Sequence, residues 1–114
     1  MGPYLGTPNK EKDSEDGANK MCLYGACSMQ GWRKGQEDAH IAFLDMPNDV
    51  HVFGVFDGHG GKEVSLYVKE IFKQKLLALE SFKQKNYEES LRVLFHDLDE
   101  LMLTEEGQAG LKDI

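Results

Sequence analysis

The residues with the clearest chemical potential follow a short apolar run at positions 52–56, which predicts a buried strand. The run ends at Asp57, Gly58 and His59. A carboxylate beside a buried strand is costly to desolvate unless it is paired, and a divalent cation is its natural partner. The Gly58 carbonyl can approach a metal closely because glycine has no side chain. His59 is a candidate general acid toward a leaving alkoxide. The sequence therefore predicts a metal site after this strand.

A second polar cluster lies upstream, between residues 31 and 40. Glu37, like Asp57, offers the hard oxygen ligands that Mg²⁺ and Mn²⁺ prefer. Arg33 carries a planar, permanently charged guanidinium that matches a phosphate dianion. Metal-held carboxylates, a phosphate-binding arginine and a proton-donating histidine fit the template for phosphomonoester hydrolysis by metal-activated water, without a covalent intermediate.

Each candidate also has a purely structural interpretation when it is considered alone. Asp57-Gly58 is an ordinary turn dipeptide, Arg33 can be a surface loop residue, and Glu37-Asp38 can end a loop at the solvent. The remaining histidines are interpreted as surface or packing residues: His40, His51 and His96. Only the conjunction of the two clusters favours a functional site.

The strands that must position these clusters are predicted from hydrophobic periodicity. They are expected at residues 22–29, 39–44 and 51–56, and a loop is expected at residues 30–35. The unbroken apolar run of the third strand indicates that both of its faces are covered.

Two amphipathic helices are predicted to follow. The first extends from about residue 62 to residue 79, and the second begins near Asn86, which forms a capping-box-like pair with Glu89. Residues 1–20 contain almost no apolar side chains and are interpreted as a flexible N-terminal arm. Three short strands and two long helices leave faces without partners, so residues 21–114 are expected to be the N-terminal part of a larger domain.

The composition excludes several protein classes. Thirteen Lys and Arg residues stand against 20 Asp and Glu residues, which gives a formal net charge of −7. The absence of a basic stripe argues against nucleic-acid binding. No apolar stretch approaches the roughly 20 residues that a membrane helix needs, and no signal peptide is recognisable.

The cysteines and the N-terminus bear on location. Cys22 and Cys27 are expected to be reduced packing residues of an intracellular protein, in the cytoplasm, the nucleus or both. The opening Met1-Gly2 suggests N-terminal acylation only weakly, because Gly6 occupies the position where that motif wants Ser or Thr.

Together, these motifs resemble those of the metal-dependent protein serine/threonine phosphatases of type 2C. Residues 52–60 fit that family's signature around Asp-Gly-His at all nine positions. Residues 28–33 followed by 37–40 are similar to the family's first motif, including its spacing. The opening Met1-Gly2 and the arm that follows also look like the start of such enzymes.

The resemblance implies a role for each candidate. Three residues would hold Mg²⁺ or Mn²⁺: Glu37, Asp57 and Gly58 through its carbonyl. Asp57 would bridge two ions in the complete domain. Asp38 would orient metal-bound water through a hydrogen bond, without binding the metal itself. Arg33 would bind the substrate phosphate, and His59 would protonate the departing Ser or Thr oxygen.

The resemblance also implies a fold and a class of substrate. The fold is α/β (α+β): an antiparallel β-sandwich flanked by helices, with the two-metal site at one end. The substrates would be phosphorylated proteins, and the complete protein is expected to be a monomer. This chain would supply only the N-terminal part of that sandwich. It would lack the aspartates that complete the family's metal site later in the domain, so the 114 residues alone are expected to be inactive.

The alternative function is that of a non-catalytic, phosphatase-like interaction protein. Such a protein would keep the motifs, lose the chemistry and bind phosphoproteins or another partner through exposed helix and sheet faces. A calcium site of the EF-hand type is disfavoured because the acidic residues do not follow its alternating loop pattern.

Overall fold

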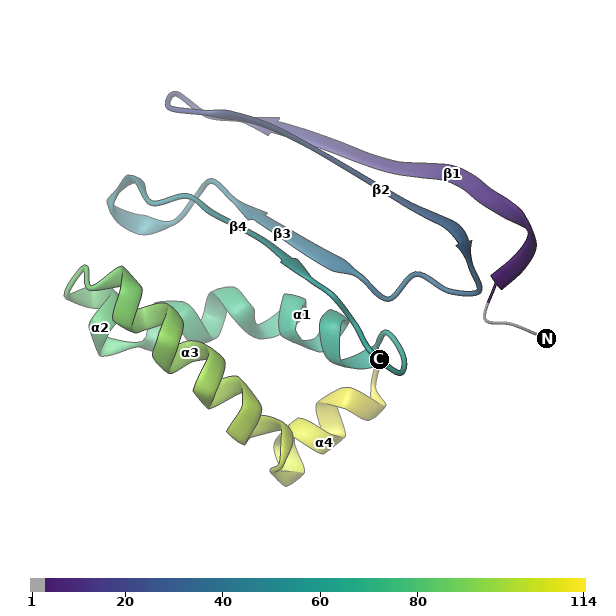
Figure 1. The fold of residues 1–114 in the computed structure, drawn as a ribbon. Helices are drawn as coiled ribbons and strands as arrows, with labels where there is room; N and C mark the ends of the chain where they lie inside the picture. The colour runs from purple at the N-terminus through teal and green to yellow at the C-terminus, as the bar shows by residue number, and fades with distance from the viewer. Residues whose placement is uncertain (1–3) are drawn as a thin grey trace. The chain divides into compact units, whose positions relative to one another are not determined.

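The structure is a computed structural model, and it describes residues 4–114; the acylation signal at Met1-Gly2 lies outside the described residues. It is a mixed α+β chain, which confirms the predicted fold class (Figure 1). The elements in chain order are β1 Tyr4–Ala18, β2 Leu23–Arg33, β3 Ala39–Phe43, the 3₁₀ turn η1 Pro47–Asp49, β4 Val52–Phe56, α1 Glu63–Ala78, α2 Glu80–Lys83, α3 Tyr87–Met102 and α4 Glu105–Lys112. The chain divides into two units: residues up to 36 with 41–54, and residues 37–40 with 55–114.

The first unit contains a long antiparallel hairpin of β1 and β2. Its tight turn is held by the Asn19 side chain, whose Oδ1 accepts hydrogen bonds from the backbone N–H groups of Met21 (2.8 Å) and Cys22 (2.9 Å). Across the strands, the Tyr24 hydroxyl donates to a Glu15 carboxylate oxygen at 2.8 Å. This hydrogen bond raises the pKa of Tyr24, with further contributions from desolvation and from the negative charges of β1.

β1 occupies the described part of the predicted N-terminal arm up to Ala18. Residues 4–18 form a regular strand, paired from Ala18 opposite Leu23 to Lys12 opposite Met29, with irregular register further toward Tyr4. Backbone hydrogen bonds to β2 maintain this strand, because its side chains are mostly exposed and charged. β2 likewise continues to Arg33, through most of the predicted loop at 30–35. The assignment of residues 21–114 to one incomplete catalytic domain stays a prediction.

β3 and β4 form a second two-stranded sheet, and their bounds lie within one residue of those predicted. The apolar run of β4 predicts cover on both faces in a complete domain, and the described part of the chain covers one face more fully than the other. Phe53 is 52% exposed and Val55 is 73% exposed, whereas their neighbours along the strand are half-buried. Among residues 4–114, alternate apolar side chains of β4 therefore lack a covering layer.

The helices of the second unit pack on one another around an apolar core. α3 lies against α1, and α4 turns back toward the start of α1 (Figure 1). The core residues of this unit include Val68, Phe72, Leu76, Phe82, Leu94 and Leu98. The Phe72 ring lies 5.4 Å from the Phe56 ring of β4 and 6.0 Å from the Phe95 ring of α3. This aromatic row joins the end of β4 to both long helices.

The starts of α3 and α4 are specified locally by capping residues. Asn86 Oδ1 accepts a hydrogen bond from the Glu89 backbone N–H at the start of α3, which confirms the predicted cap. Thr104 caps α4 in the same way by accepting from the Gly107 backbone N–H at 3.1 Å. The short helices α2 and α4 were not predicted, although Thr104 followed by two glutamates is a typical start signal.

The tight junction between α3 and α4 yields a prediction about stability. A Cβ at Gly107 would overlap the Leu101 carbonyl oxygen and lie 2.9 Å from the Met102 Cα. Gly107→Ala is therefore expected to destabilise the full-length protein by about 1–3 kcal/mol, although alanine ordinarily favours a helix by about 1 kcal/mol.

Urea unfolding measures this change, and Gly110→Ala on the same helix is the matched control. At Gly110 the obstacle is the ring of the Tyr67 side chain and not the backbone. An equal or larger loss for Gly110→Ala would contradict the proposed backbone constraint at Gly107.

Candidate active site

The two acidic segments meet at one end of the β3–β4 pair, within the second unit. Glu37 and Asp38 immediately precede β3, while Asp57 and Gly58 immediately follow β4. The Gly58 backbone N–H donates to the Glu37 carbonyl oxygen at 3.1 Å, which ties the segments together. Residues separated by some twenty positions in the sequence thus become neighbours.

A second hydrogen bond to the same carbonyl comes from α1. The Ser65 hydroxyl lies 2.5 Å from the Glu37 carbonyl oxygen and 3.1 Å from that of Lys62. Ser65 is only 3% exposed, so its hydroxyl depends on these protein partners. The start of α1 is therefore joined to the acidic segment that precedes β3.

The positions of the three glycines between β4 and α1 require glycine for two different physical reasons. A Cβ at Gly58 would overlap the Glu37 carbonyl oxygen and lie 2.9 Å from both the Glu37 Cβ and the Gly61 carbonyl oxygen. Gly60 and Gly61 have φ angles of 73° and 136°, a region that residues with a Cβ seldom adopt. Gly58 thus permits the close approach to Glu37, and the other two permit the turn into α1.

The predicted side chains differ in their exposure. Asp57, Asp38 and His59 are exposed, while Glu37 is half-buried. The carboxylate oxygens of the acidic residues are ligands of the kind that Mg²⁺ and Mn²⁺ prefer. Arg33 lies in the first unit, exposed at the end of β2, and its approach to phosphate at the acidic loop stays a prediction.

Ser65 is the functional candidate that sequence reasoning missed. It shares the buried face of α1 with Val68 and Phe72, at helical spacing. A polar residue on an otherwise apolar stripe is itself a signal, because a buried hydroxyl requires a hydrogen-bond partner. The identity of that partner, 28 positions away, could not be read from the stripe.

Comparison with known proteins identifies the family. The model of the family described as protein phosphatase 2C matches residues 22–113. The chain belongs to the protein phosphatase 2C family. It is 49% identical over 111 residues to "Protein phosphatase 2C 1" and 49% identical over 114 residues to "Probable protein phosphatase 2C 4", both of Paramecium tetraurelia. It is 43% identical over 114 residues to "Probable protein phosphatase 2C 21" of Arabidopsis thaliana.

The chain spans only part of these relatives. The matches cover 97–100% of this chain, but 37% and 38% of the two Paramecium proteins and 31% of the Arabidopsis protein. The family predicted from the two motifs is thereby confirmed. No helix within residues 4–114 is long and apolar enough to cross a membrane.

The protein phosphatase 2C chain has donors of the right kind for a metal site. The second unit brings together the carboxylate-bearing segments at Glu37 and Asp57 and the backbone of Gly58, all oxygen donors suited to Mg²⁺ or Mn²⁺. Within residues 4–114, however, no three His, Cys, Asp or Glu side chains are grouped closely enough to hold an ion. The donors therefore fit one part of a metal site.

Gly58→Ala tests the contact between the two acidic segments. The added methyl group would displace Glu37 from the loop, so the affinity of the full-length protein for Mn²⁺ is expected to fall by about 10-fold or more. Titration calorimetry measures the affinity.

Gly35→Ala is the control, because a Cβ there meets no atom within 4 Å. Unchanged Mn²⁺ binding by a folded Gly58→Ala protein would show that metal binding does not depend on this close approach.

Proposed function

We propose that the full-length protein hydrolyses phosphoserine and phosphothreonine in proteins, using Mg²⁺ or Mn²⁺ to activate water. The observation that carries this proposal is the hydrogen bond from Gly58 to the Glu37 carbonyl, which joins the two predicted acidic segments at one end of the β3–β4 pair. Family membership supports the same reaction class. The proposed substrates are phosphoproteins in the cytoplasm, the nucleus or both.

The acidic residues would have two roles, metal binding and orientation of the attacking water. Glu37, Asp57 and the Gly58 carbonyl would hold the ions, which when bound would lower the pKa of water and offset the charge of the phosphate. Asp57 would contact both ions. Asp38, exposed next to Glu37, would orient the attacking water by accepting a hydrogen bond from it.

The phosphate group and the leaving oxygen would depend on two further side chains. Arg33 would bind phosphate oxygens through its guanidinium, which holds the phosphorus for in-line attack. His59, exposed in the turn between β4 and α1, would donate a proton to the Ser or Thr oxygen as the P–O bond breaks. The reaction then needs no covalent intermediate.

The 114-residue chain by itself is expected to lack this activity. Its described part groups fewer than three potential metal-binding side chains, and one face of β4 is exposed at Phe53 and Val55. A fragment with half a metal site would bind ions too weakly to hold two of them in a fixed geometry.

A chimera tests the proposed function directly. If this chain replaces the matching segment of the Paramecium Protein phosphatase 2C 1, the chimera should release phosphate from a phosphothreonine peptide only with Mn²⁺ or Mg²⁺ present. In that chimera, Asp57→Asn keeps the shape of the side chain and removes its charge. Turnover should then fall by roughly 100-fold or more, because a bridging carboxylate contacts both ions.

Phosphate release is measured with the isolated 114-residue chain and the unaltered Paramecium protein as controls. A chimera that is folded and loaded with metal but inactive would contradict the proposal. That outcome would favour the alternative, a phosphatase-like interaction protein. Near-normal activity of Asp57→Asn with Mn²⁺ would contradict the bridging role alone.

Arg33→Ala separates phosphate binding from the chemical step. Removal of a charged hydrogen-bond donor to the ground-state phosphate should raise KM by about 10- to 100-fold with little change in kcat. Steady-state kinetics of the chimera measure both constants.

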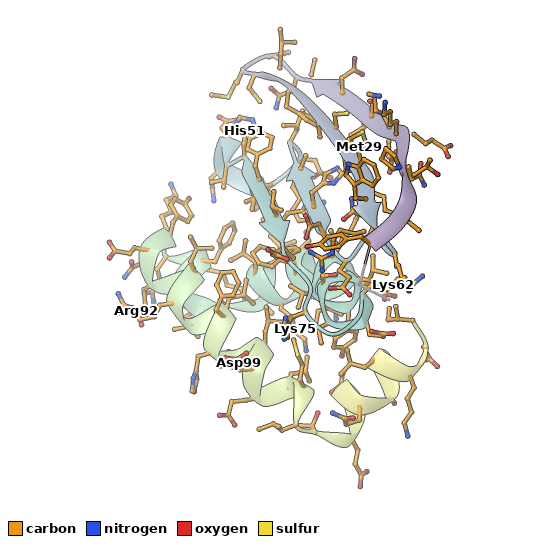
Figure 2. The ribbon with its side chains drawn as sticks, turned by 45° about the vertical axis from the view of Figure 1, so that its right-hand side comes forward. Met29, His51, Lys62, Lys75, Arg92 and Asp99 are labelled. Carbon is orange, nitrogen blue, oxygen red and sulfur yellow. The ribbon has the colours of Figure 1, made fainter. Side chains whose placement is uncertain are left out.

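Arg92→Ala is the matched control, since Arg92 lies on α3 (Figure 2). Within residues 4–114, its ion pairs are with Glu88 and Glu89 on the same helix. Its kinetic constants should not change. A loss confined to kcat in Arg33→Ala would instead assign Arg33 to the transition state.

A further inference from the structure

Ser65 has an unusual place on α1. Its side chain belongs to the buried face of the helix, yet it is polar and only 3% exposed. Two carbonyl oxygens lie within hydrogen-bond distance of its hydroxyl: Glu37 at 2.5 Å and Lys62 at 3.1 Å. Lys62 marks the start of α1 in Figure 2.

A hydroxyl has one proton, so these two acceptors compete for it. Each carbonyl oxygen also accepts a backbone N–H at 3.1 Å, Lys62 from Leu66 and Glu37 from Gly58, so only the distance to the hydroxyl distinguishes them. The Glu37 carbonyl is closer to the Ser65 oxygen and belongs to no helix or strand. The proton is therefore directed to Glu37, and the contact joins α1 to a segment 28 positions earlier.

The Glu37 carbonyl then receives two donors. The Gly58 N–H reaches it at 3.1 Å and the Ser65 hydroxyl at 2.5 Å. Two donors use both lone pairs of a carbonyl oxygen, which fixes the orientation of the peptide plane as well as its position. The Glu37 side chain leaves the backbone next to this doubly held carbonyl.

We infer that Ser65 is a positioning residue, which fixes the backbone of Glu37 so that its carboxylate is directed toward a metal held with Asp57 and Gly58. This inference rests on the proposed function. Ser65 does not itself reach the metal or the substrate. It acts by limiting the directions that the Glu37 carboxylate can take, as outer-layer partners do in metal sites.

The experiment compares Mn²⁺ affinity, by titration calorimetry, in the full-length protein and in its Ser65→Ala variant. Loss of the hydroxyl is expected to weaken Mn²⁺ binding by about 10-fold. Hydrogen exchange of the Gly58 amide should also become faster, because its acceptor carbonyl is less restrained. Ser65→Cys fills nearly the same space with a weaker donor and should show the same loss, without a cavity.

Ser90→Ala is the matched control. Ser90 is 1% exposed on α3, and its hydroxyl donates to the Asn86 carbonyl at 2.7 Å and lies 3.0 Å from the Ser81 hydroxyl. It is thus a similarly buried, hydrogen-bonded helix serine, and neither of these two contacts involves the acidic segments. Ser90→Ala should lower the melting temperature without changing Mn²⁺ affinity or Gly58 exchange.

The outcomes separate this inference from the proposed function. Weaker Mn²⁺ binding and faster Gly58 exchange in both Ser65 variants, but not in Ser90→Ala, support the positioning role. Lower melting temperatures with unchanged Mn²⁺ affinity in all three variants would overturn it and leave the proposed function intact. If the unaltered full-length protein takes up no Mn²⁺, the proposed function fails and the inference fails with it.

Discussion

The carbonyl oxygen of Glu37 is the point where three parts of the second unit meet. It belongs to the segment before β3, it accepts the N–H of the loop after β4, and it accepts the hydroxyl of α1. These contacts add to the pairing of β3 with β4 at the open end of the hairpin, where the two acidic segments lie. The close approach requires Gly58, since a Cβ there would occupy the space of this carbonyl. The acidic residues therefore depend on a backbone arrangement that they do not themselves create.

Much of this arrangement follows from local sequence signals. The alternation and apolar runs that predict β3 and β4 fall within one residue of the observed bounds. The 3.6-residue period predicts α1 and α3, and Asn86 with Glu89 predicts the start of α3. Such signals succeed because capping and amphipathic burial involve residues three or four positions apart. The sequence places the two acidic segments at the ends of neighbouring strands, and the structure joins them through the hydrogen bond from Gly58 to Glu37.

Structural features that depend on residues far apart in the chain do not follow from local sequence signals. β1 contains almost no apolar residues, so composition favours disorder, whereas pairing with β2 gives its backbone regular hydrogen bonds. The run at 52–56 appeared apolar on both faces, yet Phe53 and Val55 are exposed because burial depends on which layers are present. The partner of Ser65 lies 28 positions away and is a backbone atom, which no side-chain pattern reports.

The charged character of β1 has a consequence for how the protein behaves in concentrated solution. A free strand edge is a template onto which another polypeptide can add, which is a common route to aggregation. Here β1 takes up one edge of β2 and presents, between residues 10 and 16, two lysines and four acidic residues. Addition of a further strand at that edge would bring many charges together at short range. The charged outer strand thus discourages intermolecular β-sheet growth at its own edge of the hairpin.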